Sequence, residues 1–251
     1  GAVVDLAILG YFVDNEIPFM MEVADRTEMD KKGGHLAERL DGQLVLRESA
    51  QCPPEDTAAF QDINRHKYFN TNNLWFHLPT LYRQMSAHNN RLGLPIIRNS
   101  KTVDPRDPKS LPVYQLETAM GSAIAVFEGA QAIRVPRSRF APVKTTEDLL
   151  AVRSDAYTLT EDFRIVPSGS RKMRQFNITL DNRYYKYVSD LDERFPHGVP
   201  SLVKNKSLVI EGAFSFGKDV VCQGDVHLRN ESERQVHIPD GTILTGSLHY
   251  T

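Results

Sequence analysis

The chain has 251 residues, of which 41 % are hydrophobic and 25 % are charged, a composition typical of a globular protein with one large domain or two smaller ones. Its formal net charge is −2 and no segment accumulates basic residues, which argues against a nucleic-acid partner. No hydrophobic run approaches the roughly 20 residues that span a bilayer, so a membrane protein is not expected. The two cysteines, Cys52 and Cys222, provide no disulfide framework, and we therefore expect a reducing, cytoplasmic compartment.

The chain enters a hydrophobic segment immediately after Gly1, without an initiator methionine. Val4, Ile8, Tyr11 and Phe12 recur at helical spacing, which predicts a buried helix. The basic start of a signal peptide is not present before this helix. A helix that begins with no lead-in indicates that the chain is a fragment of a longer polypeptide.

A strand and a glycine pair are predicted next. Residues 17–23 form a short hydrophobic run that is typical of a strand. Gly33 and Gly34 permit a positive φ or the close approach of a ligand. A plain turn accounts for the two glycines equally well, so both interpretations stay open on the residues alone.

The following segment predicts a hairpin and a helix. Asp41 and Gly42 separate two short strand-like runs, residues 36–40 and residues 43–47, and an Asp-Gly pair in that position indicates a β-hairpin. A Pro-Pro pair then predicts the start of a helix over residues 55–63.

Residues 69–75, with the sequence FNTNNLW, place three asparagines within four positions and bracket them with apolar side chains. Asparagine dominates turns for local reasons, so one interpretation is a polar turn between two elements. The other is a ligand site, because an amide offers an acceptor and two donors to sugar hydroxyls, which also donate and accept.

Strands and helices alternate as far as residue 159, which predicts an α/β layered sheet. Residues 100–112 are rich in proline and charge and predict an exposed loop. Thr145 and the acidic residues after it predict a capped helix start. The further helices are predicted near residues 78–85, 119–127 and 145–152, and the further strands near residues 95–97, 113–116 and 132–135.

Towards the end of the chain the hydrophobic residues follow a different spacing. A polar, turn-rich stretch from residue 160 predicts a domain boundary, followed by a short helix near residues 187–195. Hydrophobic residues then recur every six positions, a pattern typical of a hexapeptide β-helix, and Ser232 interrupts the series. The series consists of Leu202, Leu208, Phe214, Val220, Val226, Ile238, Leu244 and Tyr250, and Ile210, Phe216, Cys222 and Leu228 repeat it two residues on. We expect domains at residues 1–159 and 197–251, joined by a linker at 160–196.

Residues 135–144, with the sequence VPRSRFAPVK, combine two prolines with Arg137, Arg139 and Lys144 directly after a predicted strand. Rigid loops at the carboxyl ends of strands are where α/β sheets bind ligands, and cations there suit a phosphate. A solvated loop whose arginines pair with surface acids is the alternative. Both roles stay open for Arg137 and Arg139.

Five motifs together resemble the eukaryotic UDP-glucose pyrophosphorylases, and they occur in that family's order over nearly the whole chain. FNTNNLW and VPRSRFAPVK are the most specific of them, and the sequence of residues 18–23, PFMMEV, is similar to the kinetoplastid branch. The other motifs are DNE at residues 14–16, KGG at residues 32–34 and QLETA at residues 115–119.

The resemblance implies a nucleotidyltransferase that makes UDP-glucose and pyrophosphate from UTP and glucose 1-phosphate, with Mg²⁺. It also implies a Rossmann-like mixed sheet followed by a left-handed parallel β-helix. By position, Lys144 would hold the phosphates around the reacting centre. The sugar site would be lined by Glu48, Phe69, Asn70 and Asn72, together with Gly33 and Gly34.

The family's nucleotide-binding loop and its magnesium-binding aspartate precede the position of Gly1, so the resemblance places them outside this chain. We therefore expect no metal ligand among these residues, an inactive chain in isolation, and the N-terminal half of the same enzyme as its partner. Two other functions are weighed against this one. A β-helix also suits a hexapeptide-repeat acyltransferase, and the chain could serve as a non-catalytic sugar-phosphate-binding or assembly module.

Overall fold

The computed structural model describes residues 3–27, 30–31, 33–139, 143–169 and 177–251. The chain divides into two compact units, which we call the N-terminal unit (residues 2–140) and the C-terminal unit (residues 141–251). Each unit is described by itself below. No described helix has the length and apolar character needed to cross a membrane.

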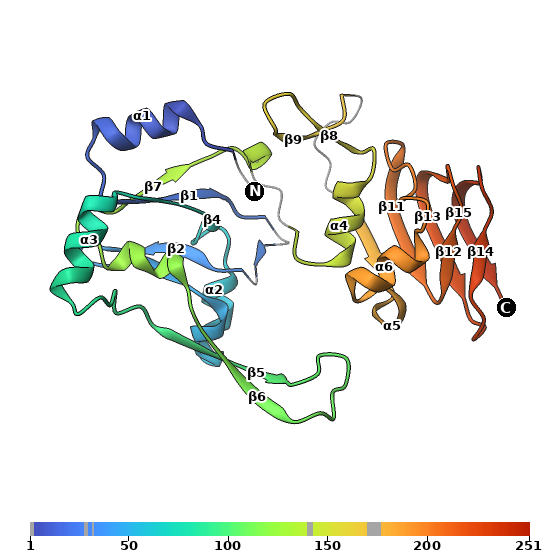
Figure 1. The fold of residues 1–251 in the computed structure, drawn as a ribbon, viewed down its shortest axis with the longest axis horizontal. Helices are drawn as coiled ribbons and strands as arrows, with labels where there is room; N and C mark the ends of the chain where they lie inside the picture. Colours follow the sequence, from blue (N-terminus) through green and yellow to red (C-terminus); the bar gives the residue numbers. More distant parts are fainter. Residues whose placement is uncertain (1–2, 28–29, 32, 140–142, 170–176) are drawn as a thin grey trace. The chain divides into compact units, whose positions relative to one another are not determined.

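The N-terminal unit is built on a five-stranded mixed sheet with the strand order β3-β2-β4-β1-β7 (Figure 1). The central strand β1 pairs with β7 in parallel and with β4 in antiparallel orientation. Every residue of β1 except its last is buried, as expected for a strand covered on both faces. The strands are β1 Phe19–Asp25, β2 His35–Glu38, β3 Leu44–Arg47, β4 Tyr68–Phe76 and β7 Gln131–Arg134. The predicted α/β class and the predicted hairpin around Asp41 and Gly42 are confirmed.

Short helices surround this sheet. The helix α3 begins at Leu78, as the sequence predicts, and the predicted helix after the Pro-Pro pair is divided between η3 and α2. The helical elements are α1 Leu6–Asp14, η2 Ser49–Gln51, η3 Pro54–Asp56, α2 Thr57–Gln61, α3 Leu78–Ala87, η4 Met120–Ala125 and η5 Arg137–Arg139. The core between these helices and the sheet is formed by Phe19, Met21, Val23, Leu46, Ala123, Ile124 and Phe127.

Two helix predictions need correction. Asp5 caps α1 by accepting hydrogen bonds from two backbone N–H groups, but Phe12 is the one fully buried residue of that helix, and Tyr11 remains 44 % exposed. The predicted burial of the whole apolar face was therefore wrong. Residues 120–125 form a 3₁₀ rather than an α-helix, and four consecutive residues of η4, beginning with Gly121, are buried.

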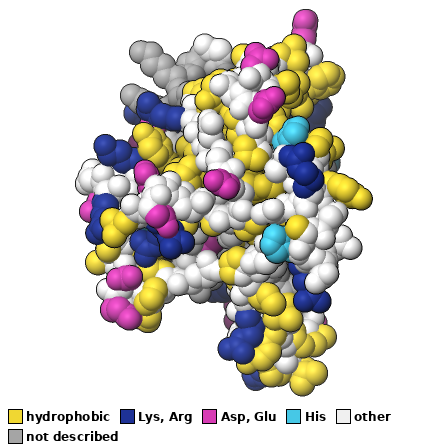
Figure 2. Space-filling model, turned by 90° about the vertical axis from the view of Figure 1, so that its left-hand side faces the viewer, with side chains coloured by type: hydrophobic (Ala, Val, Ile, Leu, Met, Phe, Trp, Pro, Cys, Tyr) yellow, Lys and Arg dark blue, Asp and Glu magenta, His cyan; other side chains and the backbone are white. Residues whose placement is uncertain are grey.

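The antiparallel hairpin of β5 (Ile96–Thr102) and β6 (Pro112–Thr118) extends away from the sheet (Figure 1). The strands reach further than predicted, so the exposed loop shortens to residues 103–111. Every residue of β6 is exposed. Figure 2 views the molecule from the left-hand side of Figure 1, and hydrophobic side chains on that face lie among charges of both signs.

The C-terminal unit consists of short helices followed by stacked parallel strands. Thr145 and Asp148 form the predicted capping box at the start of α4. The elements are α4 Thr146–Arg153, β8 Tyr157–Leu159, β9 Ile165–Pro167, β10 Asn177–Leu180, α5 Asn182–Tyr185, α6 Val188–Arg194, β11 Asn205–Glu211, β12 Phe214–Phe216, β13 Val221–Asn230, β14 Val236–Ile238 and β15 Ile243–Tyr250.

The six-residue series becomes the core of this unit. The strands β10, β11, β13 and β15 form one parallel sheet and β12 pairs with β14 in parallel (Figure 1). Leu208 pairs with Val226, three steps of the series further along. All members of both series are at most 2 % exposed except Tyr250, which is half-buried. The predicted core positions are confirmed.

Candidate functional site

The asparagine cluster lies on a bulge of β4. Met21 of β1 pairs with Leu74 and Val23 pairs with Asn70, so three residues of β4 stand opposite the single residue between Met21 and Val23. Asn72 at the middle of this bulge has a φ of 61°, a left-handed conformation that asparagine tolerates better than most residues. The segment is therefore a strand with an irregularity, rather than the turn that was one of its two interpretations.

Asn70 and Asn72 fix one another through two hydrogen bonds. Nδ2 of Asn70 donates to Oδ1 of Asn72 at 2.7 Å, and the backbone N–H of Asn72 donates to Oδ1 of Asn70 at 2.8 Å. The hydroxyl of Thr71 between them is buried and donates to the backbone carbonyl of Glu22 at 2.8 Å. The two amides are thus held together on the exposed side of the bulge, while Thr71 anchors the bulge to β1.

Glu48 lies directly against Gly34. A Cβ atom added to Gly34 would lie 2.5 Å from Oε2 of Glu48, so a side chain there would collide with the carboxylate. Gly33 is less crowded, because a Cβ there would lie 3.3 Å from the carbonyl oxygen of Asp30. The glycine pair therefore provides close approach, and at Gly34 the group that approaches is the half-buried carboxylate of Glu48.

His35 lies on β2, between β3 and β4, and connects the Gly34–Glu48 contact to the asparagine cluster. Its backbone pairs with Arg47 of β3 on one side and with Phe69 of β4 on the other. Gly34 and Glu48 adjoin this ladder directly. The sheet therefore brings together Gly34, Glu48, Phe69, Asn70 and Asn72, although up to 38 residues of chain separate them.

Phe69 is buried and the guanidinium of Arg137 covers its ring, 4.9 Å from the ring centroid. Arg137 also forms an ion pair with Asp30 at 2.9 Å. Arg139 makes two hydrogen bonds to the carboxylate of Glu22, at 2.7 and 2.9 Å, and these bonds raise the pKa of Arg139 above its usual value. Both arginines therefore have acidic partners within the N-terminal unit.

Glu22 is a buried charge with several partners. Its carboxylate accepts hydrogen bonds from Nε1 of Trp75 at 2.9 Å and from Nδ2 of Asn73 at 3.3 Å, besides those from Arg139. A buried carboxylate is tolerated when its lone pairs are satisfied in this way. Through Glu22, the loop that carries Arg139 is tied to both β1 and β4.

A histidine pair lies beneath the site. The ring of His35 is fully buried, stacks on the ring of His66 with 4.0 Å between centroids, and also contacts Phe60. Burial is the main cause that lowers the pKa of His35 to about 3, and the neighbouring charges of His66, Arg26 and Arg47 act in the same direction. His35 is therefore neutral at physiological pH and acts as a packing group.

Sequence reasoning missed Gly121. A Cβ atom added there would lie 2.7 Å from Nδ2 of Asn70 and 2.6 Å from Cδ2 of Leu46. The element η4 thus packs against the asparagine pair and forms part of the site. A glycine inside a predicted helix was the available signal, since glycine disfavours helix interiors and marks close approaches.

Lys144 belongs to the C-terminal unit, where its side chain is exposed. Its backbone N–H donates to Oδ2 of Asp148 at 2.9 Å, which fixes the lysine just before the first turn of α4. The assigned role of Lys144 at the phosphates stays a prediction. Residues 140–142, between Arg139 and Lys144, lie outside the described part of the chain.

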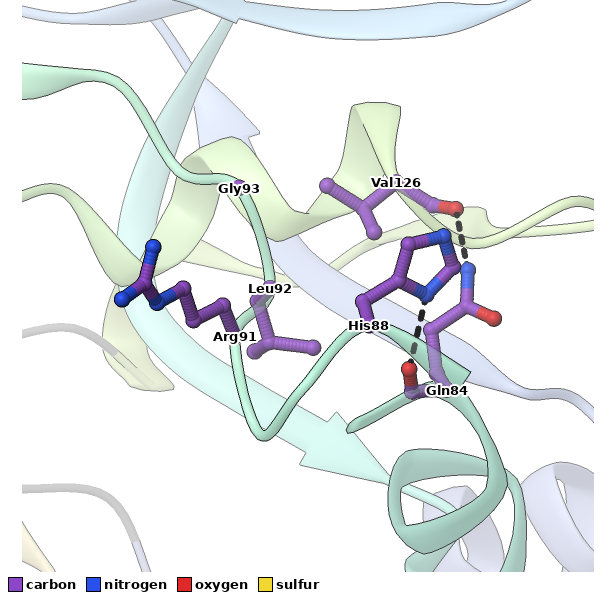
Figure 3. Close-up of a pocket in the computed structure, with 6 residues that line it drawn as sticks. All are labelled: Gln84, His88, Arg91, Leu92, Gly93 and Val126. Atoms are coloured by element: carbon purple, nitrogen blue, oxygen red, sulfur yellow. Dashed lines mark hydrogen bonds between the residues drawn. The ribbon is translucent and has the colours of Figure 1, made fainter. Parts of the chain in front are cut away.

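The pocket beside α3 is lined by other residues than those of the candidate site. A depression of about 300 Å³ is lined by Gln84, His88, Arg91, Leu92, Gly93 and Val126 (Figure 3). Its polar groups are largely occupied, since Nε2 of Gln84 donates to the carbonyl of Val126 and Nδ1 of His88 contacts the carbonyl of Gln84 (Figure 3). Within the described ranges, no group of three or more His, Cys, Asp or Glu side chains could hold a metal ion.

A family model, curated sequences and solved structures all relate this chain to the same enzyme family. The family model described as UTP--glucose-1-phosphate uridylyltransferase matches residues 1–223. The UTP--glucose-1-phosphate uridylyltransferase of Hordeum vulgare is 41 % identical over 244 residues, which are 97 % of this chain and 50 % of that protein. The probable enzyme of the same name from Schizosaccharomyces pombe is 38 % identical over 260 residues, covering 99 % of this chain and 49 % of that protein.

Solved structures of two kinetoplastid proteins are also similar. The UDP-glucose pyrophosphorylase of Leishmania major superposes with a TM-score of 0.82 at 48 % identity, covering 99 % of this chain and 55 % of that one. The Trypanosoma brucei protein gives a TM-score of 0.86 at 46 % identity, covering 100 % and 54 %. A mutant of the Leishmania protein was solved in complex with UDP-glucose. The chain spans about half the length of the curated relatives it matches.

Proposed function

The chain belongs to the UTP--glucose-1-phosphate uridylyltransferase family, and from that premise we propose that it supplies the sugar side of a uridylyltransferase site. The reaction is a direct in-line attack by a phosphate oxygen of glucose 1-phosphate on the α-phosphorus of UTP. The new P–O bond forms as the bond to pyrophosphate breaks, so UDP-glucose and pyrophosphate are the products. A reaction of this kind needs positioning and charge neutralisation rather than a protein nucleophile.

The observation that carries this proposal is the convergence of a carboxylate and two locked amides on the ladder through His35. A hexose presents hydroxyls that both donate and accept, and Glu48, Asn70 and Asn72 offer the matching acceptors and donors. Phe69, with Gly33 and Gly34, lines the same region. These residues bind and orient the sugar, and their neutral amides leave the phosphate charge to other groups.

Lys144 is proposed to neutralise the negative charge of the phosphates. An ammonium group is a mobile point charge that can follow the phosphoryl group as the bond order at phosphorus changes. Its place before the capped turn of α4 fixes the backbone from which the side chain reaches out. Arg137 and Arg139 are held by Asp30 and Glu22, which suits them to shape the loop.

The nucleotide side is assigned to residues beyond this chain, in the N-terminal half of the same enzyme. Mg²⁺ would assist the phosphates there, with its aspartate ligand supplied by that half. Within this proposal the isolated chain is inactive, and the complete enzyme acts in the cytoplasm without a membrane or nucleic-acid partner.

The parallel strands of the C-terminal unit are proposed to wind as a left-handed β-helix over residues 197–251. Their support is the six-residue spacing of core residues and the parallel pairing of β11, β13 and β15. The proposed division sets this β-helix apart from a catalytic portion at residues 1–159 by a linker at 160–196.

The proposal is tested by assaying the full-length protein that contains these residues for release of pyrophosphate and UDP-glucose from UTP and glucose 1-phosphate. Turnover that requires both substrates supports it. Hydrolysis or transfer of an acetyl group from acetyl-CoA would instead favour a hexapeptide-repeat acyltransferase. Sugar-phosphate binding with no turnover of either kind would favour a non-catalytic module, and either outcome would overturn the proposal.

A further inference from the structure

Gly121 is the point of closest packing between η4 and the asparagine pair. Its φ is not among the positive values, so backbone freedom does not explain why glycine occupies this position. The reason is steric. A Cβ there would lie 2.6 Å from Cδ2 of Leu46, 2.7 Å from Nδ2 of Asn70 and 3.3 Å from Cε of Met21.

The two shortest of these distances lead to the ends of side chains rather than to backbone atoms. The clash can therefore be relieved while the strands stay in place, but both side chains must move. Leu46 is an apolar core residue, so moving its side chain costs packing but no hydrogen bond. Asn70 cannot move without cost, because its Oδ1 and Nδ2 both bond Asn72.

We propose that Gly121 is a positioning residue of the sugar subsite, which keeps the Asn70 amide in register with Asn72 by leaving room for it. The inference rests on the proposed function, because it assigns Gly121 a role in binding the hexose phosphate. A methyl group at position 121 displaces the Asn70 amide, breaks its pairing with Asn72 and so weakens sugar binding. It leaves the binding of UTP unchanged.

The test uses four forms of the full-length protein: the unsubstituted protein, Gly121→Ala, Asn70→Ala, and the double variant. Gly121→Ala is expected to raise the KM for glucose 1-phosphate about tenfold and to change the KM for UTP less than twofold, because one polar positioning contact is lost. In the Asn70→Ala background the same substitution is expected to change the KM for glucose 1-phosphate less than twofold. Equal effects in both backgrounds, or on both substrates, would overturn the proposal.

Thermal melts of the same four proteins test the contact without reference to activity. Gly121→Ala is expected to lower Tm less in the Asn70→Ala background, since one of the two side chains it collides with has been removed and only the clash with Leu46 remains. If Gly121→Ala alone does not fold, recovery of a cooperative transition in the double variant carries this test, and its absence counts against the proposal. The matched control is Gly10→Ala, where a Cβ meets no atom within 4 Å and both KM values should stay unchanged.

The kinetic results distinguish a wrong assignment of the sugar site from a wrong role for Gly121. If Asn70→Ala alone leaves the KM for glucose 1-phosphate unchanged, Asn70 is not part of a sugar site, whatever the melts show. If Asn70→Ala raises that KM but Gly121→Ala does not, the sugar site stands and the role of Gly121 is refuted.

Discussion

The side-chain amide of Asn70 donates to Oδ1 of Asn72 while Oδ1 of Asn70 accepts the backbone N–H of Asn72, so each residue holds the other. The pair sits where β4 departs from its register with β1. The reciprocal bonds and the left-handed backbone at Asn72 make this one unit, and a change at either residue affects both.

Asn72→Ala is expected to raise the KM for glucose 1-phosphate about tenfold, since the amide that pairs with Asn70 is lost, and to leave the KM for UTP nearly unchanged. It should also destabilise the protein by about 1 kcal/mol, because alanine tolerates the left-handed conformation poorly. Asn72→Gly separates the two effects, since glycine keeps the backbone and loses the amide. An unchanged sugar KM in Asn72→Gly would mean that the amide has no part in binding.

Lys144→Ala in the full-length protein should lower kcat by about 10²–10³, the usual loss when one preorganised charge donor is removed. The stability of α4 should not change, because Asp148 caps the helix through backbone and hydroxyl groups rather than the lysine side chain. Steady-state kinetics and a thermal melt measure both quantities. Lys109→Ala, an exposed lysine of the β5–β6 loop, is the control, and a Lys144→Ala enzyme within threefold of it would refute the assigned role.

Glu22→Ala is expected to reduce the free energy of unfolding by about 3–5 kcal/mol, because it removes the carboxylate that accepts two hydrogen bonds from the largely buried guanidinium of Arg139 and leaves it the more distant ion pair with Asp5, at 3.8 Å. Urea unfolding measures the loss. Asp192→Ala breaks the exposed pair with Arg153, whose side chains are 56 % and 41 % exposed, and should cost less than about 1 kcal/mol. Similar losses for the two variants would show that the Glu22 pair is not desolvated in solution.

Acid should destabilise the N-terminal unit through His35. Its pKa is about 3 in the folded chain and 6.5 as a free side chain, so the unfolded state binds more protons between these values. The free energy of unfolding therefore falls as the pH drops below about 6.5 and continues to fall towards about 3. Burial lowers the pKa of His66 as well, which adds to the same trend.

His35→Phe should flatten this dependence and cost little at pH 7.5, because neither ring nitrogen of His35 has a hydrogen-bond partner among the described residues. Denaturant midpoints measured from pH 4.5 to 7.5 test it. His88→Gln, at an exposed histidine of the same unit, should leave the slope unchanged. A slope as steep in His35→Phe as in the unsubstituted protein would place its origin elsewhere.

The six-residue series in the C-terminal unit could be predicted from the sequence because the same spacing recurs along its parallel strands. Leu208, Val226 and Leu244 are each at most 1 % exposed, so the repeat itself reports burial. The capping box of α4 could also be predicted, because Thr145 and Asp148 are only three positions apart in the sequence. Local chemistry and repetition are what a single sequence displays directly.

Long-range packing could not be predicted in the same way. The turn preference of three asparagines is overridden by pairing of β4 with β1, which no local pattern reveals. The contact between Gly121 and Asn70 joins residues far apart in the chain, and only the packing of η4 identifies it. The site residues themselves were found through family motifs, since amide and carboxylate side chains alone fit many turns.

The bulge of β4 also has a consequence for how the protein can change. Its flanking pairs, Met21 with Leu74 and Val23 with Asn70, keep the two strands paired on either side of it. Of the three intervening residues, Thr71 bonds the backbone of Glu22 and Asn73 bonds its carboxylate, so these two tie the bulge to β1, whereas Asn72 is exposed. Within the proposed sugar site, Asn72 is therefore the bulge residue at which a substitution alters ligand contacts while both anchors to β1 remain, which makes it the first position to vary when selectivity for another sugar is sought.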